Sequence, residues 1–239
     1  MSIIRFKELQ DDIKLERQVY KAELSRLQEE TRILSHKAAD QKRSIIVVME
    51  GWDAAGKGGA IRRLTASLDP RLFRVNSIAA PNDIERKHHY LWRFWTRLPR
   101  RGFMSIFDRS WYGRVLVERV EGFAKQAEWS RSFQEINDFE RELVQAGSII
   151  CKYWIHISKE EQNTRFMGRQ NDPLKRWKLT EEDWRNRDKW DLYEAAAEEM
   201  FLKTGTSACP WVLVPGNDKY NARVFLLRDF CARLEHALD

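Results

Sequence analysis

Residues 44–59, SIIVVMEGWDAAGKGG, join the pattern of a buried strand directly to a phosphate-binding loop. Gly51, Gly56 and Lys57 match the spacing G-x-x-x-x-G-K, in which backbone N–H groups and a helix N-terminus bind phosphate. The β-branched run before the loop and the helix-compatible stretch GGAIRRLTASL after it provide the context that this motif requires. A chance glycine-rich turn is the alternative, and the strand, the spacing and the lysine together argue against it.

Gly58 occupies the position where this loop usually has serine or threonine, whose hydroxyl binds Mg²⁺ on the nucleotide phosphates. Asp53 is unusual inside such a loop, because a carboxylate repels phosphate unless a cation lies between them. Mg²⁺ prefers oxygen ligands and commonly uses one or two carboxylates together with substrate phosphates. We therefore expect Asp53 to act on the metal side of the site. The alternative is a turn residue that accepts N–H bonds from the loop.

A second carboxylate, Asp108, ends the apolar run MSIFD at residues 104–108, as the aspartate of a Walker B strand does. Because the carboxyl ends of parallel strands share one edge of a sheet, we expect Asp53 and Asp108 to lie near each other. A helix N-cap is the alternative role for Asp108. Arg109 and Arg114 follow it and are candidates either for neutralising phosphate charge or for structural ion pairs.

Short apolar runs alternate with helical stretches after residue 43, which is typical of a parallel sheet flanked by helices and predicts the α/β class. Helices are also expected at 180–204, where Thr180 and Asp183 form a start similar to a capping box, and at 217–238. The five expected strands are residues 44–50, 73–79, 104–108, 148–157 and 211–214.

Apolar residues recur at steps of three and four between residues 5 and 38, which predicts one or two amphipathic helices with a break near Glu16. We expect residues 1–43 to form a helical extension that packs on the core of a domain spanning 44–239. A coiled-coil dimer is the alternative for this segment. The recurring residues are Phe6, Leu9, Ile13, Tyr20, Leu24, Leu27 and Leu34.

The composition excludes several classes of protein. With 43% hydrophobic and 33% charged residues the chain is not disordered, and its apolar runs are too short to cross a bilayer. The N-terminus MSIIRFKELQDD lacks the apolar segment of a signal peptide, and the three cysteines are widely spaced, so reduced thiols in the cytoplasm are expected. The net charge of +6 suggests a polyanionic partner; scattered, solvated helix faces are the alternative.

Three ordered motifs together resemble the second family of polyphosphate kinases: GWDAAGKGG (51–59), DRSWYGR (108–114) and DPLKRWKLTEEDWRNRDKWDLY (172–193). The resemblance runs from about Ser44 to the C-terminus and implies a thymidylate-kinase-like P-loop fold. It implies Mg²⁺-dependent, direct in-line transfer of a terminal phosphoryl group between inorganic polyphosphate and AMP, ADP or ATP. It also implies a cytoplasmic homo-oligomer, a dimer or a tetramer, with neither nucleic acid nor a membrane as partner.

The resemblance also implies roles for individual residues around the loop. Asp53 and Asp108 would bind Mg²⁺, which accounts for the missing hydroxyl at Gly58. The residues implied to contact the reacting phosphates are Lys57, Arg109 and Arg169, and those implied to bind nucleotide or phosphate are Gly51, Gly56, Gly58, Gly59 and Arg114.

A lid over the site is implied at about residues 165–190. Asp172-Pro173 marks a loop, and its cationic face is expected of a segment that closes on phosphates and excludes water. Solvated charges without a role are the alternative, and Trp177 is expected to anchor the lid rather than to stack on a base. The cations implied to bind polyphosphate are Lys175, Arg176 and Lys178 in the lid, and Arg62, Arg63, Lys87 and Arg93 outside it.

The stretch IERKHHYLWRFW, residues 84–95, is interpreted as a helix with cations on one face. Leu91, Trp92 and Trp95 are expected on its core side. A phosphohistidine intermediate at His88 or His89 is not expected, because nothing places a histidine beside the loop and in-line transfer needs no covalent step.

Two stretches, TEEDWRNRDKW (180–190) and YLWRFWTRLPR (90–100), are similar to the subgroup that phosphorylates AMP. That subgroup typically has two fused copies of the domain, whereas this chain has one. Two other functions remain open at this point. One is an ATP-dependent nucleoside monophosphate kinase, which shares the loop and the sheet, and the other is a non-catalytic module that binds polyanions.

Overall fold

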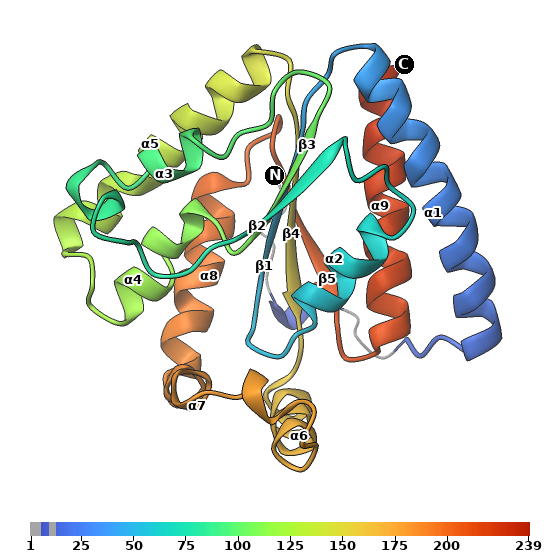
Figure 1. Cartoon of the computed structure of the whole chain (residues 1–239). Coiled ribbons are helices and arrows are strands. Elements are labelled where there is room, and N and C mark those ends of the chain that lie inside the picture. Colours follow the sequence, from blue (N-terminus) through green and yellow to red (C-terminus); the bar gives the residue numbers. More distant parts are fainter. Residues whose placement is uncertain (1–5, 10–12) are drawn as a thin grey trace.

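A five-stranded parallel sheet forms the centre of the computed structural model, which describes residues 6–9 and 13–239 (Figure 1). The strands lie in the order β2-β3-β1-β4-β5. The expected α/β class and all five expected strands are confirmed, with ends that differ by at most two residues. The strands are β1 (Ile45–Gly51), β2 (Phe73–Ser77), β3 (Met104–Asp108), β4 (Ile149–His156) and β5 (Trp211–Pro215).

The central strand, β1, is buried because helices cover both faces of the sheet. Ile45 to Met49 are each at most 2% exposed, and these apolar side chains, β-branched from Ile45 to Val48, suit a strand that is covered on both sides. Met49 lies opposite Asp108 of β3 and Tyr153 of β4. The carboxyl ends of these three strands therefore meet at one edge of the sheet.

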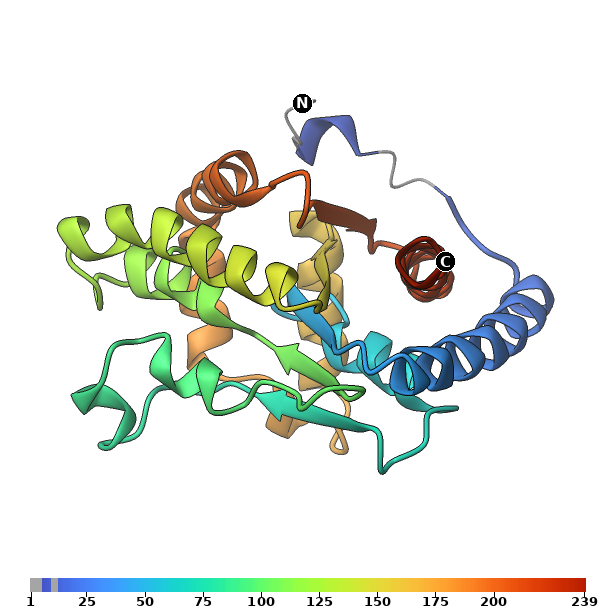
Figure 2. The same ribbon diagram turned by 90° about the horizontal axis from the view of Figure 1, so that it is seen from above.

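Two layers of helices enclose the sheet, as Figures 1 and 2 show. One face carries α1 (Arg17–Asp40), α2 (Lys57–Thr65) and α9 (Lys219–Leu238). The other face carries α3 (Trp92–Trp95), α4 (Val117–Val120), α5 (Gln126–Gln145) and α8 (Trp190–Thr204). The remaining helices, α6 (Lys159–Gln170) and α7 (Glu181–Asp188), lie beyond the carboxyl edge of the strands.

The N-terminal segment has the expected break near Glu16, since α1 begins at Arg17. The amphipathic helix expected before this break is wrong for the described residues, which form only a short 3₁₀ turn, η1 (Phe6–Glu8), and irregular backbone at residues 13–16. The part of the expected helix that falls on residue 5 and residues 10–12 lies outside the described residues. Leu27 and Ala38 of α1 are each 1% exposed and belong to the same apolar core as the sheet, and α1 packs along α9. The division of the chain at residue 43 stays a prediction.

The expectation of one helix at 84–95 is wrong. A 3₁₀ turn, η2 (Glu85–Lys87), ends at His88, whose backbone is extended, and α3 begins only at Trp92. Because this break changes the rotational phase of the helix, Phe94 is buried, whereas Trp92 and Trp95 are 36% and 46% exposed. Leu91 is buried as expected.

The helix expected at 180–204 is interrupted once, at Lys189, which separates α7 from α8. The capping box at its start is confirmed: the Thr180 hydroxyl accepts from the Asp183 N–H, and the Asp183 carboxylate accepts from the Thr180 N–H at 2.8 Å. Among the described residues, no helix is long and apolar enough to cross a membrane. The three cysteines, Cys151, Cys209 and Cys231, are free thiols and all are buried.

A fully buried ion pair joins the sheet to α5. The ammonium group of Lys152 lies 2.7 Å from the Glu140 carboxylate and also donates to the Tyr112 hydroxyl and the Thr204 carbonyl, each at 2.8 Å. Glu140 in turn accepts from the hydroxyl of Tyr112 and from the indole N–H of Trp111. This network fixes the segment that follows Asp108 against the middle of the sheet.

We expect Lys152→Met to lower the free energy of unfolding by about 3–5 kcal/mol, because it leaves the Glu140 carboxylate buried without its cation. Adding Glu140→Leu should recover part of this loss, since the buried charge is then gone while the Trp111 and Tyr112 donors still lack an acceptor. Urea denaturation of the two variants measures both effects. A double variant less stable than Lys152→Met would contradict this account.

Candidate active site

The loop between β1 and α2 owes its shape to residues with positive φ. Gly51, Ala54 and Gly56 have φ angles of 137°, 61° and 112°. A Cβ atom on Gly51 would lie 2.4 Å from the Ile155 carbonyl oxygen, so this position requires glycine for space as well as for conformation. The first N–H groups of α2 have no partner earlier in the helix. The loop and the helix start therefore form an anion site from their backbone.

Lys57, the first residue of α2, lies across this loop. Its ammonium group donates to the Gly51 carbonyl at 2.7 Å and to the Trp52 carbonyl at 3.1 Å. These contacts keep its positive charge at the mouth of the loop, where the motif places a phosphate.

Trp52 attaches the loop to the neighbouring elements α8 and β4. Its ring stacks on Trp190 at the start of α8, with centroids 3.7 Å apart, and its indole N–H donates to Nδ1 of His156 at 3.1 Å. Burial lowers the pKa of His156 to about 4, so this imidazole is neutral near pH 7 and accepts the bond. The loop is thus fixed to the start of α8 and to the end of β4.

Asp53 projects from the loop between two donors. One carboxylate oxygen accepts from Arg109 at 3.1 Å, and the other accepts from the Asn186 side-chain amide at 2.8 Å. Burial by itself would raise the pKa of Asp53, but the charges of Lys57 and Arg109 and these hydrogen bonds lower it below its usual value. Asp53 is therefore an anion near neutral pH and not a plain turn residue.

Asp108 ends β3 beside β1, as the sequence predicts, and lies opposite Met49 and Ser77 in the register of the sheet. Among the described residues, no hydrogen bond or ion pair engages its carboxylate. Its alternative role as a helix N-cap is not adopted, because Ser110 caps the 3₁₀ turn η3 (Trp111–Arg114) by accepting from the Tyr112 N–H. The Asp108 side chain is thus available for binding.

Glu50, immediately before the loop, belongs to the site although the sequence analysis did not select it. It is 5% exposed and accepts from the Ser110 hydroxyl at 2.7 Å. Burial raises its pKa, and the hydrogen bond from Ser110 and the charges of Lys57 and Arg109 only partly offset this effect. Its position next to Gly51 in the quoted motif is the signal that would have identified it.

The carboxylates of Asp53 and Asp108 fit a Mg²⁺ site that is completed by substrate. Within residues 6–9 and 13–239, no group of three or more His, Cys, Asp or Glu side chains would hold a metal by itself. Mg²⁺ does not need such a group, because it is commonly bound through one or two carboxylates together with phosphate oxygens and water. Asp108, which has a free carboxylate, offers the oxygen ligand that Gly58 cannot.

Arg109 follows Asp108 and has a positive φ of 63°. In addition to its bond to Asp53, its guanidinium lies 4.0 Å from the Glu182 carboxylate of α7. Burial lowers the pKa of Arg109, but the charges of Asp53 and Glu182 outweigh burial and raise it. Arg109 therefore links the loop, the end of β3 and α7.

The lid expected at about residues 165–190 comprises the end of α6, the connection that follows it, and α7. Arg169 at the end of α6 donates to the Lys178 carbonyl at 3.0 Å, and Lys175 pairs with Asp172. Trp177 is 74% exposed, so the expectation that it anchors this segment is wrong. Its indole N–H donates to the Leu174 carbonyl at 3.0 Å, and the Lys178 ammonium lies 5.1 Å from its ring centroid, so both contacts are with residues next to or within the 3₁₀ turn η4 (Arg176–Lys178).

The other candidate cations differ in their surroundings. Arg93 pairs with the buried Glu85 at 3.3 Å, and Arg114 pairs with Glu118 at 3.1 Å, so both have structural partners. Arg63 donates to the Gly59 carbonyl at 3.3 Å. Arg62 and Lys87 are exposed. Their binding of a phosphate chain stays a prediction.

The two neighbouring histidines bond to residues other than those of the loop. His88 stacks on Trp92, with ring centroids 4.2 Å apart, and its Nδ1 lies 2.9 Å from the Ile84 carbonyl oxygen. His89 lies 3.6 Å from the Glu135 carboxylate of α5. The expectation that neither histidine takes part in the chemistry stays a prediction.

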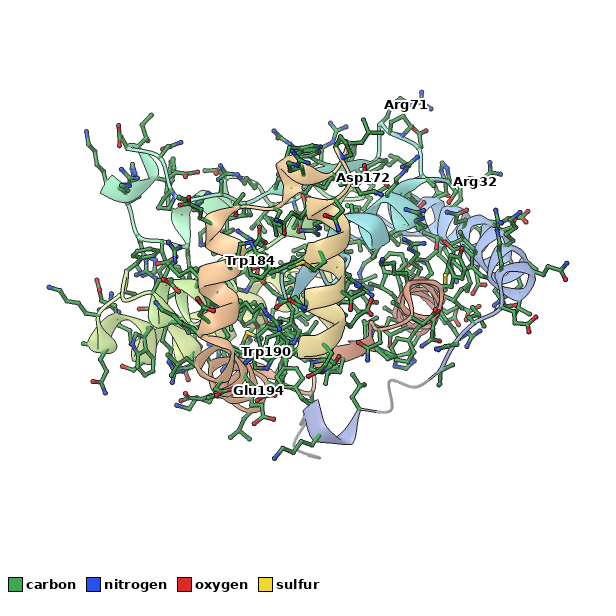
Figure 3. All side chains as sticks on the ribbon, turned by 90° about the horizontal axis from the view of Figure 1, so that it is seen from below. Arg32, Arg71, Asp172, Trp184, Trp190 and Glu194 are labelled. Carbon is green, nitrogen blue, oxygen red and sulfur yellow. The ribbon has the colours of Figure 1, made fainter. Side chains whose placement is uncertain are left out.

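A network in α7 and α8 brings Asn186 to the loop, and sequence reasoning missed it. The side-chain oxygen Oδ1 of Asn186 accepts from the Tyr193 hydroxyl at 3.2 Å. Tyr193 also bonds to Glu121, which pairs with Arg185 at 3.1 Å and Lys189 at 2.9 Å. Figure 3 shows α6 and α7 side by side, with Trp184 directed toward α6, where its ring packs against Phe166.

The strand order, the phosphate-binding loop after β1 and the aspartate that ends β3 define a P-loop kinase fold. The family model "Polyphosphate kinase 2 (PPK2)" matches residues 14–238. The chain belongs to this family.

Similar proteins include two curated polyphosphate:AMP phosphotransferases. The one from Pseudomonas aeruginosa is 50% identical over 93% of this chain and 45% of its own length, and the one from Acinetobacter johnsonii is 48% identical over 92% and 46%. The chain thus spans about half the length of these relatives.

Two solved structures of polyphosphate kinase 2 proteins are also similar to this chain. The crystal structure of a putative polyphosphate kinase 2 from Pseudomonas aeruginosa has a TM-score of 0.94 at 49% identity and matches 97% of this chain and 50% of that one. Polyphosphate kinase 2 from Arthrobacter aurescens also has a TM-score of 0.94, at 32% identity over 99% of this chain and 87% of that one.

Alanine substitutions at Gly51 and Gly58 should change the free energy of unfolding in opposite directions. Gly51→Ala should lower the free energy of unfolding by more than about 2 kcal/mol, because it combines a positive φ with a clash against the β4 backbone. A Cβ atom at Gly58 would have no neighbour within 4 Å. Gly58→Ala should therefore raise the free energy of unfolding by about 0.5–1 kcal/mol, because alanine has a higher helix propensity than glycine. Chemical denaturation of both variants checks this. A similar loss in both would refute the steric assignment.

Proposed function

We propose that this chain catalyses the Mg²⁺-dependent transfer of a terminal phosphoryl group between inorganic polyphosphate and a nucleotide. The observation that carries the proposal is the combination of two carboxylates, Asp53 and Asp108, with Lys57 and Arg109 around one phosphate-binding loop. Family membership supports the same reaction. A loop intended only to hold a polyanion has no need of Asp53, which repels phosphate unless a cation intervenes.

In the proposed reaction, an oxygen of the acceptor phosphate forms a bond to the terminal phosphorus of polyphosphate, and the bridging P–O bond breaks. The shortened chain leaves with the bridging oxygen as a phosphate anion, so no separate proton transfer is required. Lys57, Arg109 and Arg169 stabilise negative charge on the transferring group and on the leaving oxygen. Glu50 and Asn186 hold Ser110 and Asp53 in place.

Asp53 and Asp108 are the residues that would hold Mg²⁺. When bound, this ion neutralises phosphate charge and draws donor and acceptor phosphates together. The lid residues Lys175, Arg176 and Lys178 supply further positive charge from the segment between α6 and α7, which excludes water when it closes.

AMP is the acceptor we propose first. Relatives named polyphosphate:AMP phosphotransferase are 48–53% identical to this chain, whereas those named for ADP or NDP are 40–45% identical. ADP is the second acceptor, since the same in-line chemistry needs only a terminal phosphate.

The decisive experiment measures ADP and ATP formation by the purified chain from long-chain polyphosphate with AMP or ADP, with and without Mg²⁺. We expect Mg²⁺-dependent product, formed faster from AMP. Transfer from ATP but not from polyphosphate would instead establish a nucleoside monophosphate kinase. Tight polyphosphate binding without transfer would establish a binding module.

Asp108→Asn should lower kcat at least about 100-fold, because it removes a carboxylate from the metal and phosphate site. The melting temperature should change by less than about 2 °C, since the described residues make no hydrogen bond to this carboxylate that the variant could lose. Steady-state kinetics and calorimetry of the same preparation test the two statements. Activity close to that of the parent would remove Asp108 from the proposed site.

A further inference from the structure

Arg165, on the inward face of α6, uses every N–H donor of its guanidinium. The side chain is 5% exposed, although arginine is rarely buried without full compensation. Its Nε donates to Glu161 at 2.6 Å, one turn earlier in the helix. Its other four donors bond to the carbonyls of Ala54 (3.1 Å), Ala55 (2.7 Å), Gly216 (2.6 Å) and Asn217 (3.1 Å).

These contacts join the phosphate-binding loop to the turn between β5 and α9. A neighbour of Arg165 extends the pattern: the side-chain amide of Gln162 donates to the Asp53 carbonyl at 3.1 Å. Three consecutive loop carbonyls, those of residues 53–55, therefore bond to α6.

The orientation of these carbonyls decides where the loop N–H groups point. In a trans peptide group the C=O and N–H bonds are antiparallel. Holding the carbonyls of residues 53–55 toward α6 turns the N–H groups of residues 54–56 away from it. The Ala55 N–H bonds to the Trp52 carbonyl at 3.1 Å, which leaves those of Ala54 and Gly56 for the side of the loop that faces an anion.

Lysine cannot reproduce this arrangement. The guanidinium is planar, carries five donors in a fixed fork and remains charged at all relevant pH values, whereas an ammonium offers three donors from one atom. Glu161 fixes the rotation of the fork. The positive φ of Ala54 costs energy for a residue with a side chain, and the bond from Arg165 to its carbonyl helps to offset that cost.

The same helix also contacts the segments expected to move. Arg169, one turn after Arg165, bonds to the Lys178 carbonyl. On the other side, Arg187 of α7 donates to the Gln162 side-chain oxygen at 3.1 Å and to the Lys159 carbonyl at 2.6 Å. α6 therefore contacts the loop, the segment around η4 and α7.

We propose that Arg165, assisted by Gln162, is a positioning residue that sets the orientation of the loop's N–H groups for phosphate binding. The kinetic part of this inference rests on the proposed phosphotransfer, whereas the part that concerns anion binding does not. Arg165 touches no reacting atom and acts through the backbone of residues 53–55.

The test compares Arg165→Lys with a matched control, Arg43→Lys. Arg43 also bridges backbone carbonyls, those of Gly147 and Ala237, but lies before β1, at the opposite end of the sheet from the loop. Three quantities are measured for each variant: tripolyphosphate binding by calorimetry, kinetics with polyphosphate and AMP, and melting temperature.

We expect Arg165→Lys to weaken tripolyphosphate binding and to lower kcat/KM for polyphosphate by about 100-fold each, with the KM for AMP changed less than about twofold. Arg43→Lys should lower the melting temperature comparably and leave binding and kinetics at the parent values. Guanidinium ion at millimolar concentration should partly restore binding to Arg165→Ala, because it can occupy the vacated site.

Parent-like tripolyphosphate binding by a folded Arg165→Lys variant would overturn the proposal, whatever its melting temperature. If Arg165→Lys does not fold, Gln162→Leu replaces it, and a loss of less than about threefold in tripolyphosphate binding would count against the proposal. A parent protein that binds tripolyphosphate but shows no turnover would refute the proposed function, while the binding data would still decide the role of Arg165. Absence of tripolyphosphate binding by the parent would overturn this inference.

Discussion

The candidate site depends on one constraint: β3, β1 and β4 run parallel in the middle of the sheet and end at the same edge. This geometry brings Asp108, Glu50 with its loop, and the start of α6 together although they are far apart in the sequence. The buried Lys152–Glu140 pair extends the constraint, because it fixes the segment after Asp108 against the sheet through Tyr112. The position of the site residues is therefore fixed by β3 and β4, the strands on either side of β1, as well as by the loops.

The three carboxylates of the site differ in their surroundings, and burial and neighbouring charges shift the pKa values of Asp53 and Glu50 in opposite directions. Asp53 faces two donors and the charge of Lys57, so its anionic form is favoured. Glu50 is buried, and burial raises its pKa, whereas the pKa of Asp53 is lowered. Asp108 remains without a partner among the described residues. Three acidic side chains within one small region thus differ in what they can bind: one is held by arginine and asparagine, one by a serine hydroxyl, and one is free for a ligand.

Local patterns predicted those parts of the fold that local interactions determine. The β-branched run before Gly51 and the aspartate at the end of MSIFD predicted both a strand and a site residue, because burial and strand direction are visible in a few neighbouring residues. The helix at 84–95 was mispredicted, because nothing in the apolar and cationic pattern marks the extended backbone at His88 that separates η2 from α3. Asn186 and Arg165 were missed for a different reason: their partners in the phosphate-binding loop lie more than 100 positions away, and no spacing rule connects them.

Lys57 and Arg109 already have partners inside the protein, the former on two loop carbonyls and the latter on Asp53. For these two cations, binding of a phosphate chain is consequently an exchange of partners. The net affinity that each cation contributes is the difference between its interaction with phosphate and its interaction with the protein's own oxygens. When the phosphate leaves, the cation can bond to those oxygens again. A site built in this way favours rapid departure of a highly charged ligand over long retention, which suits the proposed transfer from polyphosphate.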